Sequence, residues 1–452
     1  MTRVIVESLN LEAQGVARPL DEQGIPGKVV FIDGALPGED VEFESYKIKS
    51  KFELAKLKQI YRVSPSRIAP QCPSFQECGG CSMQHLDARA QLAMKQRVLE
   101  DNLKYLGRVR PDVLLRPIAG PSWGYRYRGR LSIFKIPKGR VLVGFHQKKG
   151  SRITDMLSCD ILPPHVSDLL PKWRELIAQL SIPGRMAQLE FAIGEGEQEH
   201  SLRTVFVLRH LEPLTLADEN LLRNFSEFHQ VDILLQSSCL VSAKPFHPVN
   251  SFLCYRLPEV GIEMPFKPTG FTQVNHQVNQ VLVGRAIRLL DPQPNERVID
   301  LFCGIGNFTL PLARLSSQVF GVEGSDSLTQ RAMSNAKHNQ LEKQVSFACA
   351  NLFEVNAQTI RAWGQADKWL IDPPRDGAMA LATALAELAQ SKDPKDQNYL
   401  PKRIVYVSCN PATLARDVGI LVGQAAYRLK SAGVINMFPH TSHIESIAVF
   451  ER

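Results

Sequence analysis

The sequence predicts a doubly wound α/β domain at its carboxyl end, preceded by a mixed α+β region and a small β-barrel. From about residue 266, apolar β-branched segments alternate with amphipathic ones, which is the pattern of a parallel sheet covered by helices. Residues 1–62 instead contain short strand-like runs separated by turn residues, as in oligonucleotide-binding barrels. We therefore divide the chain into residues 1–62, 63–265 and 266–452.

The positive charge is concentrated in the front third of the chain. The formal net charge is +7, and residues 1–150 hold 25 Lys and Arg against 15 Asp and Glu. A basic surface attracts polyanions, so we expect this part to bind nucleic acid. A basic surface that only serves solubility would have the same composition, and this alternative stays open.

Three observations predict a cytoplasmic protein without a membrane partner. No apolar run approaches the ~18 residues of a membrane span. Residues 1–10 lack the apolar core of a signal peptide. The nine cysteines are an odd number in a long chain, which argues against a disulfide framework.

A glycine-containing turn follows the first predicted strand of the α/β domain. Arg297-Val-Ile-Asp-Leu-Phe-Cys-Gly-Ile-Gly-Asn-Phe-Thr309 is a buried strand followed by a Gly-x-Gly turn and a helix. Gly304 and Gly306 let the backbone approach a ligand closely. The next predicted strand ends in Glu323, where a carboxylate can accept hydrogen bonds from ribose hydroxyls. We expect a nucleoside-type cofactor here, with packing glycines as the alternative.

Cys409 directly follows another predicted buried strand, residues 404–407, and Asn410-Pro411 ends that strand. A further strand ends in Asp372-Pro-Pro. Ligands bind outside the carboxyl ends of the strands in open α/β sheets, so the thiol is expected to face the site. Most free cysteines are small buried hydrophobes, which is the competing interpretation.

The last segment offers three candidates for a general base, namely His440, His443 and Glu445. His443 and Glu445 are two residues apart and share one face if the segment is extended. Glu445 stands in an otherwise apolar stretch, which favours a functional role over that of a paired structural carboxylate.

Cys72, Cys78 and Cys81 have the spacing of metal ligands. Thiolates of this kind bind zinc or an iron–sulfur cluster, and Cys159 is the best candidate for a fourth ligand. Unligated loop cysteines are the alternative. The other cysteines are expected to be core or packing groups: Cys239, Cys254, Cys303 and Cys349.

Two segments of the basic region suit RNA. A stripe of lysines follows the predicted barrel strands, although few aromatic residues accompany it. Its members are Lys47, Lys49, Lys51, Lys56 and Lys58. Further on, Trp123-Gly-Tyr-Arg-Tyr-Arg-Gly-Arg130 interleaves aromatics with arginines, which suit splayed bases and the RNA backbone.

Together these motifs closely resemble the bacterial uracil-C5 RNA methyltransferases, in particular the 23S ribosomal RNA type with a TRAM barrel and an iron–sulfur cluster. The resemblance covers nearly the whole chain and is most specific at residues 300–309 and 407–417. It implies a Rossmann-like class I methyltransferase domain over residues 266–452. It also implies an OB-like TRAM barrel over residues 1–62 and a central iron–sulfur domain over residues 63–265.

The resemblance also implies a reaction and its residues. Cys409 would be the nucleophile toward C6 of uracil, and Glu445 the base that takes the C5 proton. A 4Fe–4S cluster would be held by Cys72, Cys78, Cys81 and Cys159. The contacts to S-adenosylmethionine would fall on Gln273, Phe302, Asn307, Glu323, Asn351 and Asp372.

The chemistry explains why a thiol is needed. C5 of uracil is a poor nucleophile toward a sulfonium methyl group, and thiolate addition at C6 creates an enolate that attacks through C5. The C5 proton must then leave before the thiolate can be eliminated, which requires a base. Arg375 and Asp376 follow Asp372-Pro-Pro where amine-methylating relatives carry an aromatic residue, so carbon is the favoured target.

Two alternatives remain. The first is a relative that acts on tRNA or on another 23S site, but the barrel and the cysteine triplet favour ribosomal RNA. The second is a non-catalytic RNA-binding protein with a degenerate methyltransferase fold, but Cys409 and Glu445 are both retained. We expect a monomer that binds 23S ribosomal RNA and does not bind DNA.

Overall fold

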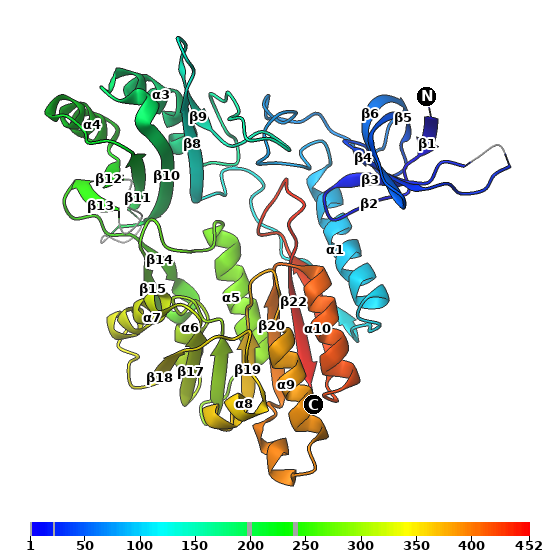
Figure 1. The fold of residues 1–452 in the computed structure, drawn as a ribbon. Coiled ribbons are helices and arrows are strands. Elements are labelled where there is room, and N and C mark those ends of the chain that lie inside the picture. The colour runs from blue at the N-terminus through cyan, green and yellow to red at the C-terminus, as the bar shows by residue number, and fades with distance from the viewer. Residues whose placement is uncertain (1, 21–22, 197–200, 238–242) are drawn as a thin grey trace.

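The computed structural model describes residues 2–20, 23–196, 201–237 and 243–452. Figure 1 shows three parts, with an N-terminal sheet and a central sheet above a larger C-terminal domain. Within the described ranges, none of the helices combines the length and the apolar character needed to cross a membrane. Cys239, which was expected in the core, lies outside the described residues.

The N-terminal part is a six-stranded sheet in the order β1-β5-β6-β4-β3-β2. Its strands are β1 (Thr2–Ile5), β2 (Ser8–Leu9), β3 (Gln14–Ala17), β4 (Val29–Asp33), β5 (Asp40–Ile48) and β6 (Phe52–Arg62). Alternate residues such as Val30, Ile32 and Val41 are buried together, because successive side chains of a strand point to opposite faces. Three register shifts between β5 and β6 bend this pair.

The central part is a second sheet with helices packed against it. Its path is β13-β12-β11-β10-β14-β15, and β8 joins β9 to β10. Trp173 packs on Phe206 of the sheet and on Phe225, which fixes both long helices there. The elements are β8 (Arg128–Lys135), β9 (Val141–Gly144), α2 (Pro164–Ser167), α3 (Leu169–Gln179), η1 (Pro183–Arg185), β10 (Met186–Glu195), β11 (Leu202–His210), α4 (Leu216–His229), β12 (Asp232–Gln236), β13 (Lys244–His247), β14 (Cys254–Leu257), η2 (Pro258–Val260) and β15 (Ile262–Pro265).

The C-terminal domain confirms the predicted α/β fold. Its sheet has the order β18-β17-β16-β19-β20-β22-β21-β7, and β16 to β20 are parallel. The strands are β16 (Arg297–Leu301), β17 (Gln318–Glu323), β18 (Val345–Cys349), β19 (Lys368–Ile371), β20 (Arg403–Ser408), β21 (Arg428–Ile435) and β22 (Glu445–Glu451). The helical elements are α5 (His276–Leu290), α6 (Thr309–Ala313), α7 (Asp326–His338), α8 (Ala357–Trp363), α9 (Met379–Gln390), η3 (Pro394–Tyr399) and α10 (Pro411–Gly423).

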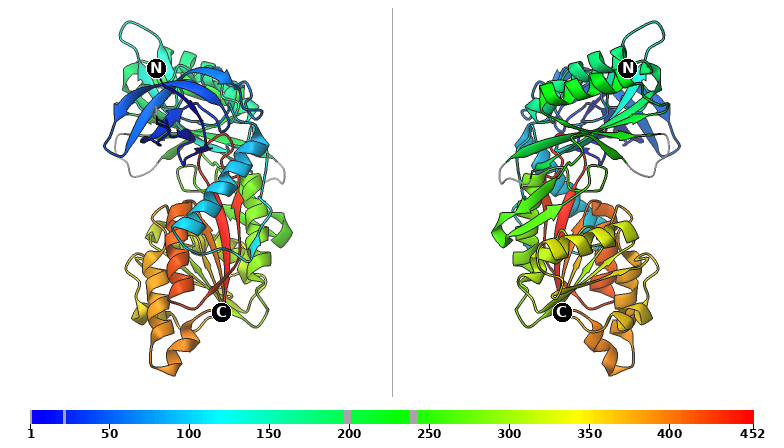
Figure 2. Two further views of the ribbon diagram at one scale, coloured as in Figure 1. Left: turned by 90° about the vertical axis from the view of Figure 1, so that its right-hand side faces the viewer. Right: turned by 90° about the vertical axis from the view of Figure 1, so that its left-hand side faces the viewer.

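Two apolar cores cover the two faces of this sheet. Val298 packs with α5 on one face, and its neighbour Ile299 packs with α9 and α10 on the other. Figure 2 shows these helices on opposite sides of the sheet. The central strands β16, β19 and β20 are thus buried on both faces, which explains their continuous apolar runs in the sequence.

Two elements from before residue 266 join the C-terminal domain. Helix α1 (Ala88–Tyr105) buries Val98, Leu99 and Leu103 in the core that also holds Leu414 of α10. Strand β7 (Val113–Leu114) pairs in parallel with β21 at the edge of the sheet. The C-terminal domain therefore receives elements from both sides of residue 266.

Candidate active site

The predicted cofactor and nucleophile residues gather at one edge of the C-terminal sheet. Phe302, Glu323, Asn351 and Asp372 stand at or just after the carboxyl ends of β16, β17, β18 and β19. Cys409 follows β20 in the same way. Parallel strands bring these ends to one edge, so the sequence-based expectation of their proximity holds.

Glu445 reaches this edge for a different reason. Strand β22 runs antiparallel to β20, so the start of β22 lies beside the end of β20. Ser408 pairs with Ser446, and the Ser446 hydroxyl donates to the Ser408 carbonyl at 3.2 Å. The neighbours of this pair are Cys409 and Glu445. The thiol and the carboxylate are therefore brought together by the strand register.

Burial raises the pKa values of Glu445, Asp372 and Cys409, and repulsion between charges adds to the rise for Glu445 and Cys409. Glu445 is 7% exposed, and burial raises its pKa to about 8, with Asp372 adding to the rise and Arg375 opposing it. Burial likewise raises the pKa of Asp372 to about 7. The pKa of the half-buried Cys409 thiol rises to about 12, chiefly through burial and then through Glu445 and Asp372. A bound cation would lower all three pKa values.

Arg375 is the cation on the Asp372 loop. Its charge lowers the pKa of Cys409 and of Glu445, opposing the effect of burial. Its backbone carbonyl accepts hydrogen bonds from Asn410 Nδ2 and Thr413 Oγ1, both at 3.1 Å. These bonds tie the Asp372 loop to the start of α10, which follows Cys409. Arg375 thus favours the ionised forms of Cys409 and Glu445, although burial outweighs its effect on both pKa values.

The loop after β16 is strained in the way that ligand loops often are. Phe302 has a φ of +62°, which is rare for a bulky side chain, and Gly304 and Gly306 also have positive φ. The Glu323 carboxylate accepts hydrogen bonds at 3.0 Å from the amides of Gly304 and Ser325. The acidic residue of the second strand is therefore held against the glycine turn.

Asp300 lies beneath this loop. It is fully buried, and one oxygen accepts a hydrogen bond from Thr309 Oγ1 at 2.5 Å. The other oxygen has no partner among the described residues. Burial raises the pKa of Asp300 to about 8. An unpaired buried oxygen under a glycine turn is a feature that a bound ligand or water can satisfy.

The other expected cofactor residues differ in their surroundings. Asn307 Oδ1 accepts hydrogen bonds from Tyr255 and Asn279, so it links the glycine turn to β14 and α5. Gln273 is half-buried in the loop before α5. Asn351 is exposed, and its side chain accepts from the amide of Phe353.

Residues 436–444, called the base loop below, connect β21 to Glu445. His440 in this loop has a φ of +63° and is 2% exposed, and its ring stacks on Trp123 with centroids 3.9 Å apart. Burial lowers the pKa of His440 to about 4. His443 is exposed, and its Nδ1 atom lies 3.2 Å from the Nη2 atom of Arg375. His440 is thus a packing residue, and Glu445 is the buried carboxylate that faces Cys409.

Several residues that hold the base loop escaped the sequence analysis. Lys95 Nζ donates to Asn436 Oδ1 and to the Phe438 carbonyl, both at 2.9 Å. Gln91 and Ser82 also contact the loop, through His440 and Ser442. The signal was present in α1, because Gln91 and Lys95 occupy the same face as its buried apolar residues.

The aromatics of residues 123–130 were expected to suit splayed bases, and this expectation was wrong for Tyr125, which is buried. Trp123 stacks on His440, and the buried Tyr125 hydroxyl donates to the Pro439 carbonyl at 2.9 Å. Both side chains therefore contact the base loop, Tyr125 from the protein interior and Trp123 from a half-buried position. The interleaved pattern could not distinguish this internal role from base stacking.

The four candidate ligand cysteines, Cys72, Cys78, Cys81 and Cys159, line one small cavity. Burial raises the pKa of Cys81 to about 11 and that of Cys159 to about 12, and the neighbouring thiols add to both shifts. In the ranges that the structure describes, no three His, Cys, Asp or Glu side chains are arranged to hold a metal ion.

The remaining cysteines give a mixed outcome. Cys254 and Cys303 are buried, as predicted, and the Cys303 sulfur packs near Gly321. The prediction for Cys349 was wrong, because this residue is exposed. It ends β18, which is the edge strand of the sheet and is therefore less covered than the central strands.

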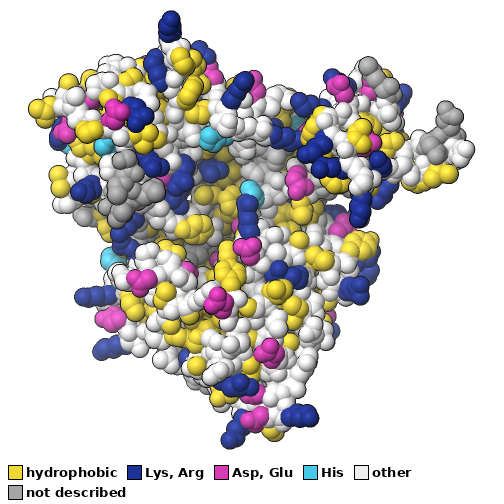
Figure 3. Space-filling model, in the orientation of Figure 1, with side chains coloured by type: hydrophobic (Ala, Val, Ile, Leu, Met, Phe, Trp, Pro, Cys, Tyr) yellow, Lys and Arg dark blue, Asp and Glu magenta, His cyan; other side chains and the backbone are white. Residues whose placement is uncertain are grey.

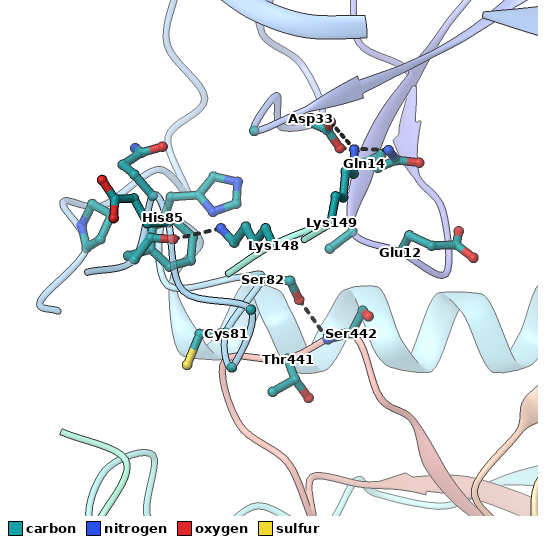
Figure 4. A pocket seen from close by; sticks show the side chains of 18 of the residues that line it. Glu12, Gln14, Asp33, Cys81, Ser82, His85, Lys148, Lys149, Thr441 and Ser442 are labelled. Carbon is teal, nitrogen blue, oxygen red and sulfur yellow. Dashed lines mark hydrogen bonds and ion pairs between the residues drawn. The ribbon is translucent and has the colours of Figure 1, made fainter. Parts of the chain in front are cut away.

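A cleft of about 1430 Å³ lies where the three parts meet. Four segments line it: the N-terminal sheet, residues 70–85 (called the cysteine segment below), the turn at Lys148 and Lys149, and the base loop (Figure 4). Lys149 Nζ bonds Asp33 at 2.5 Å, while Lys148 donates to the Phe75 carbonyl at 2.7 Å. Figure 3 shows Lys and Arg side chains around the hollow between the parts. All five lysines of the predicted stripe are exposed, and Lys56 and Lys58 line the cleft.

Comparison with known proteins gives the family. A family model described as tRNA (Uracil-5-)-methyltransferase matches residues 87–452. The chain belongs to this family. The start of the match at residue 87 agrees with the packing of α1 and β7 onto the C-terminal domain.

Members of this family with established names are similar to the chain over its whole length. It is 58% identical over 448 residues to the 23S rRNA (uracil(1939)-C(5))-methyltransferase RlmD of Cupriavidus necator. The match covers 99% of each of the two chains. The protein of the same name from Ralstonia pickettii is also 58% identical, over 99% of this chain and 98% of its own.

A solved structure shares the fold. The Pyrococcus abyssi tRNA (uracil-54, C5)-methyltransferase, in complex with S-adenosyl-L-homocysteine, superposes with a TM-score of 0.71. The match covers 99% of this chain and 100% of the other at 23% identity. This likeness concerns the fold alone.

Proposed function

We propose that this protein transfers a methyl group from S-adenosylmethionine to C5 of a uridine in 23S ribosomal RNA. The observation that carries the proposal is the juxtaposition of Cys409 and Glu445 across β20 and β22, next to the Asp372 loop. Membership of the family supports uracil C5 as the target. The names of the full-length relatives support 23S ribosomal RNA.

In the proposed reaction, the Cys409 thiolate adds to C6 of uracil, and the electron pair of the C5–C6 double bond passes into the ring as an enolate. C5 then attacks the methyl group of the co-substrate, and the methyl–sulfur bond breaks so that the sulfonium sulfur leaves as a neutral thioether. Glu445 removes the C5 proton, the double bond re-forms, and the C6–sulfur bond breaks to return the thiolate. A pKa of about 8 suits a carboxylate base that works near neutral pH. The target base must leave its stack to reach Cys409.

S-adenosylmethionine, when bound, supplies the methyl group and a positive sulfonium charge. The residues that would hold it are Gln273, Phe302, Asn307, Glu323, Asn351 and Asp372. The left-handed glycine turn, the unpaired oxygen of Asp300 and the position of Glu323 support a nucleoside-type ligand at this edge. A cation beside Asp372 also favours the ionised forms of the carboxyl groups and of the Cys409 thiol.

We further propose that Cys72, Cys78, Cys81 and Cys159 hold a 4Fe–4S cluster. Their common cavity supports this assignment, because ligation would relieve the cost of the buried Cys81 and Cys159 thiols, whose pKa values are raised. No step of the reaction transfers an electron. The proposed role of the cluster is to order the cysteine segment, which lines the cleft.

The RNA is proposed to enter the cleft between the three parts. Exposed lysines of β5 and β6 and the basic residues around Lys148 support this path. In this proposal residues 1–62 form a TRAM-type barrel, residues 63–265 the iron–sulfur domain and residues 266–452 the catalytic domain. Cytoplasmic location, a monomeric state and the lack of DNA binding stay predictions.

The proposal is tested by mass-spectrometric mapping of 5-methyluridine in ribosomal RNA and tRNA from cells that lack the protein. We expect one or more methyluridines to disappear from 23S ribosomal RNA and to return when the wild-type gene is restored. Cells restored with Cys409→Ala serve as the matched control. Loss from tRNA alone would instead indicate the tRNA substrate, and unchanged methyluridine in both RNAs would contradict the proposal.

A further inference from the structure

The base loop is held in place by residues that lie far from it in the sequence. Gln91 and Lys95 are one turn apart on the buried face of α1, and both contact the loop. The Tyr125 hydroxyl donates a hydrogen bond to the Pro439 carbonyl, and Ser82 Oγ accepts one from the amide of Ser442. Glu445 is the residue directly after the base loop, so the position of its carboxylate depends on these contacts.

Lys95 differs from the other residues that contact the loop because it carries a charge. Its side chain is fully buried, and its ammonium group donates to one side chain and one carbonyl, at Asn436 and Phe438. Burial lowers the pKa of Lys95, whereas ionised Glu445 raises it, so each of these two groups favours the charged form of the other. A lysine is rarely buried unless its charge is paired, so a partner or a task is expected.

The charged groups around Glu445 come from several elements. Asp372 and Arg375 approach from the loop after β19, and the Cys409 thiol approaches from the end of β20. Lys95 approaches from α1. Burial lowers the pKa of the exposed His443, and the charges of Arg375 and Lys95 lower it further. Lys95 and Arg375 are the two cations that favour the ionised form of Glu445, and Lys95 is the buried one.

We propose that Lys95 is a positioning residue for the removal of the C5 proton, fixing the base loop through Asn436 and Phe438 while its charge stabilises ionised Glu445. This inference rests on the proposed function. It assigns Lys95 to one step of the reaction and not to the others.

The geometry limits the effect to that step. The Cys409 turn is fixed by other contacts, namely the bonds from Asn410 and Thr413 to the Arg375 carbonyl. The glycine turn follows β16 and Glu323 ends β17, and among the described residues neither has a hydrogen bond to the base loop. Loss of Lys95 should therefore leave adduct formation and methyl transfer near normal. It should slow the release of the methylated RNA.

The test compares single-turnover reactions of the full-length holoenzyme with an RNA fragment over a range of pH. Lys95→Met removes the charge, Lys95→Arg retains it, and Tyr125→Phe removes one hydrogen bond to the same loop without a change of charge. Formation of the covalent RNA adduct and its disappearance are followed on denaturing gels. Binding of S-adenosylmethionine reports whether each variant is folded.

We expect Lys95→Met to accumulate the adduct and to shift the midpoint of the release-rate profile to higher pH by about one unit. Release below that midpoint then slows about tenfold. Lys95→Arg should keep the wild-type midpoint, and Tyr125→Phe should slow release without a shift. If Lys95→Met does not bind the donor, Lys95→Gln takes its place, because it lacks the charge but keeps an N–H donor.

An unshifted midpoint in the charge-removing variant would overturn the inference, as would an equal slowing of adduct formation. The proposed function fails differently, because the wild-type protein would then form neither an adduct nor methyluridine.

Discussion

At the scale of single residues, the site is a group of acids kept protonated by burial. Glu445 and Asp372 have raised pKa values near neutrality, and the Cys409 thiol is raised further by both. Arg375 opposes the shifts of Glu445 and Cys409, and Lys95 opposes that of Glu445, without reversing them. The resting site is thus poised to ionise when a cation binds, which is the charge that S-adenosylmethionine would bring.

Glu445→Gln should trap the reaction after methyl transfer. The amide cannot accept the C5 proton, so Cys409 stays bonded to C6. We expect release to slow by about 10²- to 10⁴-fold and a band of higher mass to appear on a denaturing gel. The adduct should map to the peptide that contains Cys409. Wild-type turnover by this variant would remove Glu445 from the mechanism.

The raised pKa of Glu445 also predicts how stability depends on pH. The folded protein keeps a proton up to about pH 8, whereas the unfolded chain releases it near the ordinary glutamate pKa of about 4.3. The carboxyl group therefore destabilises the donor-free protein as the pH rises through this window. Glu445→Gln should be about as stable as wild type below the window and more stable above it. Urea unfolding of both proteins at several pH values measures the difference, and a constant difference would contradict the burial argument.

At the scale of elements, the direction of each strand decides which side chains meet at the edge of the sheet that holds the site. The sequence predicted the edge formed by β16 to β20, because each motif follows an apolar run. It could not predict that β22 enters antiparallel and brings Glu445 to the same edge. It also assigned Trp123 and Tyr125 to RNA, since composition does not show whether an aromatic faces a ligand or the base loop.

The stability of the β21–β22 pair should be sensitive to substitution of Gly433, which packs against Leu115, the residue that follows β7. A Cβ atom at Gly433 would lie 2.7 Å from the Leu115 Cβ and 3.0 Å from the Leu115 carbonyl. Gly433→Ala should lower the free energy of unfolding by about 1–3 kcal/mol. Gly423→Ala at the end of α10 is the control, because a Cβ there meets nothing within 4 Å. Equal stability of the two variants in urea unfolding would contradict the packing.

At the scale of the whole molecule, the base loop is where the parts converge. The cysteine segment contacts it through Ser82 and Met83, α1 through Gln91 and Lys95, and the cleft opens beside it. These contacts span more than 340 positions of the chain. Local sequence patterns contain no information about contacts at that range. The motifs could therefore be predicted from the sequence, whereas the residues that hold the base loop could not.

Loss of the proposed cluster should weaken RNA binding more than donor binding. The cysteine segment lines the cleft, while the donor residues lie on the sheet edge. Chelation, or Cys78→Ser, should therefore reduce the affinity for an RNA fragment and leave the affinity for S-adenosylmethionine nearly unchanged. Filter binding and calorimetry measure the two affinities, with Cys349→Ser as the control at an exposed cysteine. An unchanged RNA affinity would exclude the ordering role.

The central claim is that Cys409 is the nucleophile of uracil methylation. The most direct measurement is the transfer of a labelled methyl group from S-adenosylmethionine to uridine C5 in a 23S RNA fragment, by wild-type and Cys409→Ala proteins. We predict labelled 5-methyluridine with the wild-type protein and none with the variant, although both bind the donor equally well. Turnover by Cys409→Ala at the wild-type rate would contradict the account.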